Sequence, residues 1–229
     1  MIGLRLPPTK LSFSGAVGAE RLLLLGVRLM PRRPNRALAR DLETDRLRLR
    51  SIGPLRLLWQ IAPWHRDPEL MEALRGHRGP MPLIKWLSSG GRPNNIHRFC
   101  YAIVPKGQSK PVGVIYMNLS WTDSSAATHM AISDPAWRGH QVSVEARSAP
   151  LTLFFDNGVT VFTAEPRARN LGSIFVYKKL GFRVVGAVRF DPEEAEPDRI
   201  RFVMTREAWR ERQARIAGTA PSQPAGPDR

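Results

Sequence analysis

Several short runs of the chain alternate apolar and polar residues with the period of a β-strand. The run Arg46–Ser51 alternates leucine with arginine, which predicts a half-buried strand. Two more runs, Arg98–Val104 and Val112–Trp121, flank the turn-rich segment PKGQSKP and predict a β-hairpin. The remaining strand patterns lie later in the chain, at Thr128–Ser133, Val159–Glu165, Phe182–Phe190 and Arg199–Thr205.

Helical patterns separate these strands. The amphipathic segment Leu171–Leu180 predicts a helix, and Gly181 follows it at the position where helices commonly end. A longer helix is predicted over Gln141–Asp156. Earlier in the chain, two short helices are predicted at Pro54–Trp64 and Pro68–Arg75, each with a proline near its first turn. A long loop is predicted to follow them at 76–95. Antiparallel hairpins followed by a strand–helix–strand crossover predict a mixed α/β fold, with helices packed on a central sheet.

The chain is long enough for one domain with tails, because it has 229 residues of which 42% are apolar. The predicted strands and helices place that domain at residues 42–205. Residues 1–41 are predicted to form a basic, flexible extension. Residues 206–229 are predicted to form a short helix and then a disordered tail rich in proline, alanine and glycine.

The net charge of +15 is distributed unevenly along the chain. The first 40 residues hold 8 basic residues and 1 acidic residue, so nearly half of the excess lies in the predicted extension. A basic surface attracts phosphates, acidic ligands and nucleic acid without selecting among them. No stripe of basic and aromatic residues is present, so the sequence does not favour dedicated nucleic-acid binding, and a basic nucleic-acid adaptor is kept only as an alternative.

The single cysteine, Cys100, excludes a disulfide framework and a cysteine-built zinc site, and it indicates a reducing compartment. No run of 18 apolar residues is present, so no membrane span is predicted. The apolar run Leu22–Val27 is short for the core of a signal peptide, and Glu20–Arg21 precedes it. These features predict a cytoplasmic protein without a metal site.

The first candidate for chemistry is a strand that leads through a tight turn into a helix. The strand Thr128–Ser133 is followed by the turn DPAWRGH and then by the helix that starts near Gln141. The first amides of a helix lack intrahelical acceptors and favour negative charge, so this arrangement can bind an anion. Arg138 and His140 would add donors for a phosphate.

The second candidate is the start of the next predicted helix. Asn170 is a natural N-cap, Ser173 lies inside the first turn, and Tyr177 follows four residues later on the same face. On the residues alone, two interpretations stay open for this group. Asn170 and Tyr177 either cap and pack the helix or contribute to a binding site.

Four segments together resemble the GNAT superfamily of acetyltransferases, and most of all its RimJ/RimL-like branch. They are ETDRLRLR at 43–50, the turn DPAWRGH after its strand, Glu-Ala at 145–146, and the pattern N-x-x-S-x-x-x-Y-x-K-L-G-F at 170–182. The similarity spans residues 42–205. It implies a mostly antiparallel central sheet, helices on both faces of that sheet, and a splayed central pair of strands.

The resemblance also implies an activity, the transfer of an acetyl group from acetyl-CoA to a primary amine by direct attack in a ternary complex. The amine would belong to a protein N-terminus or a small molecule. Backbone amides of the phosphate loop and the start of the next helix would hold the cofactor, and Tyr177 would protonate the departing thiolate. The cofactor contacts implied are Ile132, Arg138, Gly139, His140, Gln141, Val142, Ser143, Asn170 and Ser173.

Three residues depart from the family pattern. Gln141 and Ser143 stand where the phosphate loop has small residues, and Pro150 lies inside the following helix, where it removes a hydrogen bond. A degenerate GNAT-fold domain that only binds a ligand is therefore the alternative to an active enzyme.

The group that removes the proton from the amine is left open by the sequence. His129 on the central strand is the candidate, His97 lies before a neighbouring strand, and a chain of water molecules can serve the same purpose. Glu145 is interpreted as a helix-start charge. Arginines in the predicted substrate region disfavour a highly cationic acceptor and favour a peptide or an acidic small molecule; they are Arg66, Arg75, Arg78 and Arg92.

Overall fold

The computed structural model describes residues 35–53, 56–57, 93–139, 141–189 and 197–218. All of them belong to one structural unit, Arg33–Arg229. Apart from residues 56–57, which are helical, the two short helices predicted between residues 54 and 75 lie outside the described residues, and so does most of the loop predicted to follow them. The same holds for residues 1–34 of the predicted extension and for the tail after residue 218.

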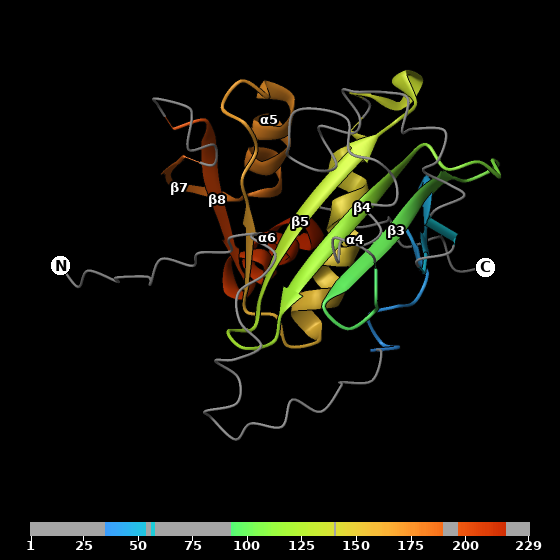
Figure 1. Ribbon diagram of the computed structural model, residues 1–229, viewed down its shortest axis with the longest axis horizontal. Coiled ribbons are helices and arrows are strands. Elements are labelled where there is room, and N and C mark those ends of the chain that lie inside the picture. The colour runs from blue at the N-terminus through green and yellow to red at the C-terminus, as the bar shows by residue number, and fades with distance from the viewer. Residues whose placement is uncertain (1–34, 54–55, 58–92, 140, 190–196, 219–229) are drawn as a thin grey trace, which may run out of the picture. The chain divides into compact units, whose positions relative to one another are not determined.

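A single eight-stranded sheet, in the order β1-β2-β3-β4-β5-β6-β8-β7, organises this unit (Figure 1). Neighbouring strands run antiparallel, except that β5 and β6 are parallel. The strands are β1 (Leu42–Glu43), β2 (Leu47–Ser51), β3 (Arg98–Pro105), β4 (Gly113–Ser120), β5 (Ser125–Ile132), β6 (Val161–Ala164), β7 (Arg183–Val188) and β8 (Arg199–Thr205). The predicted strand at Thr128–Ser133 thus begins earlier, at Ser125.

The helices follow the predicted order. They are the 3₁₀ turn η2 (Pro135–Trp137) and the α-helices α4 (Val142–Asp156), α5 (Leu171–Leu180) and α6 (Arg206–Gly218). Asn170 caps the start of α5, and Gly181 ends it with a φ of 89°, a left-handed conformation that glycine adopts without strain. Helix α4 continues through Pro150 as one helix. No helix among the described residues is long and apolar enough to cross a membrane.

Alternation along β3 and β4 divides the core into two clusters. Phe99 of β3 belongs to the larger cluster, on the face that α4 and α5 cover, and its ring meets Phe154 of α4 edge-on at 5.1 Å. Figure 1 shows α4 lying against β3, β4 and β5. Cys100, the next residue of β3, faces the smaller cluster on the opposite side, where burial raises the pKa of its thiol.

The packed region begins before residue 42, where the sequence placed the domain boundary. Leu38 is fully buried, and its carbonyl accepts a hydrogen bond from the Tyr101 hydroxyl. Asn35 starts this turn by accepting hydrogen bonds from the amides of Ala37 and Leu38. Part of the predicted extension, residues 35–41, therefore contributes to the core.

Strands β5 and β6 separate part-way along their length. They are paired only at Ser125↔Val161, Ala126↔Phe162 and Ala127↔Thr163. Strand β5 continues to Ile132 beside β4, whereas β6 ends at Ala164 beside β8. The mixed, mostly antiparallel sheet and the splayed strand pair are therefore confirmed. We call the point of separation, at Thr128, the fork.

Candidate functional site

The fork is closed by a tyrosine from helix α5. Thr128 is the first residue of β5 beyond the last pair with β6, and its carbonyl accepts a hydrogen bond of 3.1 Å from the hydroxyl of Tyr177. This hydroxyl in turn accepts a hydrogen bond of 3.3 Å from Nη2 of Arg147 on α4. The Arg147 guanidinium also lies 4.8 Å from the centre of the Tyr177 ring. Three elements thus meet in one polar group.

Two buried polar atoms at the fork have no hydrogen-bond partner among the described residues. Arg147 is 4% exposed and its Nε has no acceptor. Thr128 is 1% exposed and its Oγ1 is likewise without a partner. Buried polar groups in native proteins are nearly always hydrogen-bonded, so two exceptions in one place indicate a site that a ligand completes.

The start of helix α4 presents backbone amides to an anion. The residue before the helix, Gln141, has a φ of 58° and a ψ of 5°, and its side chain makes no capping hydrogen bond. The amides of Val142 and Ser143 lie in the first turn, where no intrahelical acceptor is available. An uncapped helix start of this kind favours negative charge.

Gln141 has a left-handed backbone, the conformation that glycine adopts most easily, although the family pattern has glycine here and this chain does not. Two residues earlier, Gly139 has a φ of 89°. A left-handed conformation costs most residues about 1–2 kcal/mol, whereas glycine adopts it freely. Gln141 therefore keeps the backbone path of a glycine loop at some cost in stability.

The predicted donors beside this loop have different surroundings. Arg138 is exposed, and its Nε donates a hydrogen bond of 3.2 Å to the carbonyl of Ile132 at the end of β5. His140 lies outside the described residues. The Arg138 contact joins the end of β5 to the turn before α4, so two of the predicted contact residues lie together.

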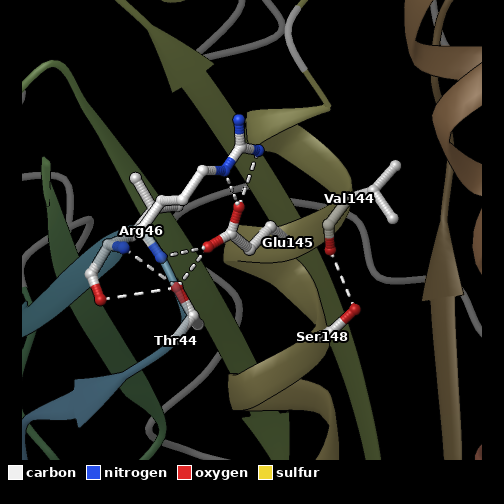
Figure 2. Close-up of polar contacts among 6 residues, drawn as sticks. Thr44, Arg46, Val144, Glu145 and Ser148 are labelled. Carbon is white, nitrogen blue, oxygen red and sulfur yellow. Dashed lines mark hydrogen bonds and ion pairs between the residues drawn. The ribbon is translucent and has the colours of Figure 1, made fainter. Parts of the chain in front are cut away.

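A network of hydrogen bonds and an ion pair connects the turn between β1 and β2 to helix α4 (Figure 2). Oε1 of Glu145 accepts hydrogen bonds from the Thr44 hydroxyl at 2.6 Å and from the Arg46 amide at 2.9 Å. Oε2 accepts from Nε and Nη2 of Arg46, both at 2.7 Å. Burial acts to raise the pKa of Glu145, but the hydrogen bonds from Thr44 and Arg46 and the Arg46 charge lower it overall. A carboxylate held in this way is a structural clamp and a poor proton acceptor.

The family model of the acetyltransferase (GNAT) domain matches residues 46–183. The chain belongs to the GNAT family of acetyltransferases. The matched residues include Arg46 and Glu145 of the clamp, the fork, the loop before α4 and helix α5.

Solved GNAT structures share the fold at low sequence identity. An acetyltransferase of the GNAT family from Bacillus anthracis is 17% identical, covers 73% of this chain and 99% of its own, and has a TM-score of 0.60. Spermidine N-acetyltransferase from Vibrio cholerae, in complex with CoA and spermine, is 13% identical, with coverages of 72% and 99% and a TM-score of 0.59.

Ribosomal-protein-S5-alanine acetyltransferase from Vibrio fischeri is 16% identical, with coverages of 74% and 98% and a TM-score of 0.56. No curated protein matches the sequence. At these identities the solved structures establish the GNAT fold of this chain.

Within the GNAT fold, Asn170 and Ser173 serve the start of α5. The side-chain oxygen of Asn170 accepts a hydrogen bond of 3.0 Å from the amide of Ser173. Asn170 is exposed, so its side-chain NH₂ group can still donate to a ligand. Capping and ligand binding, the two interpretations that the residues left open, are therefore compatible.

The two predicted catalytic residues lie on opposite sides of the sheet. His129 is on β5 and faces away from helix α5, which carries Tyr177. His129 pairs with Tyr116 of β4, which belongs to the smaller core cluster, whereas Thr128 pairs with Met117 of the larger cluster. Directly paired residues of neighbouring strands share a face of the sheet. Helix α5 covers the other face, so the structure does not bring these side chains together.

The environment of His129 makes its imidazole a weak base. Burial, followed by the positive charges of Arg147 and Arg199, lowers the pKa of His129 to about 4. The imidazole is therefore neutral at neutral pH. It can accept a proton, but its conjugate acid is much stronger than that of an unperturbed histidine, whose pKa is about 6.5.

Arg147 was not predicted from the sequence as a site residue, although its position carried a signal. Arg147 lies on the same helical stripe as Pro150, Leu151 and Phe154, all of which are buried. A single arginine on the apolar face of a helix is unusual, because arginines are almost never fully buried without a partner.

Replacing Gln141 with glycine is expected to stabilise the folded protein. Glycine removes the cost of the left-handed backbone, and the Gln141 side chain makes no capping hydrogen bond that would be lost. We expect a gain of up to about 1 kcal/mol, or roughly 2–4 °C in melting temperature. Glycine does not weaken the first turn of α4 here, because Gln141 precedes the helix and its backbone is left-handed. Gln141→Val, with a branched side chain at the same φ, should lower the melting temperature; equal melting temperatures for all three proteins would contradict this account.

Proposed function

We propose that this protein transfers an acetyl group from acetyl-CoA to a primary amine, as a cytoplasmic member of the RimJ/RimL-like branch of the GNAT family. One observation carries the proposal: the Tyr177 hydroxyl lies at the fork, where β5 loses its pairing with β6. Tyr177 thereby holds a proton donor beside the unpaired edge of β5. Strand β5 leads through a short turn to the uncapped start of α4.

The residues present fit the chemical groups of acetyl-CoA. The amides of Val142 and Ser143 and the exposed Arg138 suit the pyrophosphate. Beyond Ala127, the edge of β5 that faces away from β4 is free of β6, and such an edge suits the amide groups of the pantetheine arm. Acetyl-CoA supplies the activated thioester when it is bound.

The reaction requires two proton movements. The nitrogen of the neutral amine forms a bond to the thioester carbonyl carbon, and the carbon–sulfur bond breaks. The amine loses a proton to water or to a protein base, and the departing thiolate takes a proton from the Tyr177 hydroxyl. A phenol and a thiol are of sufficiently similar acidity for this transfer to be efficient.

Two kinds of acceptor are represented among the solved neighbours. One is a spermidine N-acetyltransferase and the other a ribosomal-protein-S5-alanine acetyltransferase. We propose a protein N-terminus or a small amine without high positive charge as the acceptor here. The buried positive charge of Arg147 at the fork supports this choice, because it would repel a polyamine.

A melting assay with matched polyanions tests the binding step. We expect acetyl-CoA to raise the melting temperature more than ATP or pyrophosphate at the same concentration, and the difference to persist at about 0.5 M salt. Non-specific binding of phosphates to a basic protein weakens steeply with salt, whereas a fitted pantetheine arm does not depend on charge.

Release of free thiol in the presence of candidate amines then tests the transfer step. Binding without thiol release across protein N-termini and small amines would favour the alternative of a GNAT-fold binding module. Binding that disappears with salt and does not distinguish acetyl-CoA from ATP would contradict the proposed function altogether.

A further inference from the structure

Arg147 is a buried cation without a counter-ion among the described residues. It is 4% exposed, its Nη2 donates only to the uncharged Tyr177 hydroxyl, and its Nε has no acceptor. Removing a charge from water is unfavourable unless an opposite charge and hydrogen bonds compensate for it. Arg147 therefore destabilises the protein by itself, and a ligand with a negative charge would compensate for this.

The other charged groups described near the fork do not supply that negative charge. Arg199 is itself positive and has its own carboxylate, with its Nε 3.7 Å from Oδ2 of Asp198. The positive charges of Arg147 and Arg199 both act on His129, which stays neutral. On the face toward α5 the neighbours of Arg147 are Tyr177 and, through its hydroxyl, the carbonyl of Thr128. The fork is thus a cationic, largely buried environment.

We propose that Arg147 binds a carboxylate group of a substrate at the fork. The proposal rests on the proposed function, which brings the acyl group and the amine to Tyr177, and Arg147 contacts Tyr177 directly. A guanidinium group is planar, remains charged, and matches a carboxylate with two parallel hydrogen bonds. The Thr128 hydroxyl has no hydrogen-bond partner among the described residues and is a further donor, on the residue whose carbonyl binds Tyr177. The carboxylate belongs either to the acyl group of the donor or to the amine acceptor.

A comparison of two CoA thioesters of equal chain length tests the donor as the source. Succinyl-CoA ends in a carboxylate and butyryl-CoA in a methyl group, and both share the CoA portion. If the acyl group carries the carboxylate, wild-type protein binds succinyl-CoA at least about 10-fold more tightly in calorimetric titration, the effect of one charged hydrogen bond. Arg147→Met should abolish the preference, and Arg147→Lys should retain part of it.

A comparison of acceptors tests the other source. With acetyl-CoA as donor, peptides or amino acids that carry a carboxylate are compared with the corresponding amides. If the acceptor carries the carboxylate, its KM is lower than that of the amide by at least about 10-fold, and Arg147→Met removes the difference. Either preference supports the proposal and identifies the source.

Stability in the absence of ligand separates a binding role from a structural one. Because Arg147 has no carboxylate partner in the part of the chain that the structure describes, the melting temperature of Arg147→Met should equal or exceed that of the wild type. Arg199→Met is the matched control: Arg199 is 8% exposed, but it pairs with Asp198 and donates to the carbonyl of Glu165, so its removal should lower the melting temperature.

Three results would overturn the proposal. The first is binding of acetyl-CoA with no carboxylate preference in either comparison, which leaves the proposed function intact. The second is a loss of stability in Arg147→Met as large as that in Arg199→Met. The third is failure of every CoA thioester to bind, which would overturn the proposed function as well.

Discussion

Replacing Tyr177 with phenylalanine is expected to lower turnover by about 10²–10⁴-fold while the dissociation constant of acetyl-CoA changes little. The substitution removes the proton donor and keeps the ring, which packs edge-on against Phe182 at 5.2 Å. Steady-state kinetics at saturating acetyl-CoA give the turnover, and titration gives the affinity. An equal loss of affinity would instead assign Tyr177 to packing.

Tyr101→Phe is the matched control for this experiment. Tyr101 is also buried, and its hydroxyl also donates to a backbone carbonyl, that of Leu38, but it lies on β3 away from the fork. Each substitution leaves one buried carbonyl without its donor, which costs about 1–3 kcal/mol of stability. Tyr177→Phe also leaves Nη2 of Arg147 without its acceptor, so we expect it to lose at least as much stability as Tyr101→Phe, and only Tyr177→Phe to lose turnover. A similar loss of turnover in both would show that stability alone is responsible.

Replacing Glu145 with alanine is expected to lower the free energy of unfolding by about 2–3 kcal/mol, or roughly 4–12 °C in melting temperature. The substitution removes the acceptor for the Thr44 hydroxyl, the Arg46 amide and the Arg46 guanidinium (Figure 2). Since this clamp holds the first turns of α4, acetyl-CoA affinity should also fall. Glu43→Gln removes only exposed ion pairs of 3.6 Å to Arg48 and Lys106, so it should change stability by less than about 1 kcal/mol.

The effect of Glu145 on stability should depend on pH in a defined direction. Because folding lowers the pKa of Glu145 from its ordinary value of 4.5, the folded protein binds the proton less readily than the unfolded chain. The stabilisation is therefore complete above about pH 5 and is lost as the pH falls through the lowered pKa. Melting temperatures of wild type and Glu145→Ala should converge below that range, and a constant difference from pH 7 to pH 3 would contradict the role of the charge.

Elements with strong local signals were predictable from the sequence. The bounds of α5 and β8 match the predictions residue for residue, because Asn170 and Gly181 mark the two ends of α5 and a regular run of β-forming residues marks β8. The start of β5 was missed. Its first three residues, Ser125–Ala127, are small and have little strand preference of their own, and they extend because β4 and β6 both pair with them.

For the site too, features with a local motif could be predicted from the sequence, and features that depend on distant contacts could not. Tyr177 and the loop from Arg138 to Ser143 could be proposed as site residues from their motifs, because those residue types follow each other at fixed spacing. The clamp could not be predicted, although the two segments that form it, 43–50 and 145–146, both belong to the family resemblance. Thr44 and Glu145 are 101 positions apart, and only the packing of α4 against the turn between β1 and β2 brings them into contact.

By itself the sequence determined the order and type of most described elements, the family and the position of the turn before α4, since each depends on periodicity and on residues near one another in the chain. Only the tertiary structure decided which face of β5 carries His129, that the backbone of Gln141 is left-handed, and that Arg147 is buried against Tyr177. The physical reason is that a side chain's face, backbone strain and burial depend on neighbours that the fold supplies. An arginine on a helix is ordinary until the packing of β5 and α5 around it removes the water and leaves it, among the described residues, with the uncharged Tyr177 as its hydrogen-bond partner.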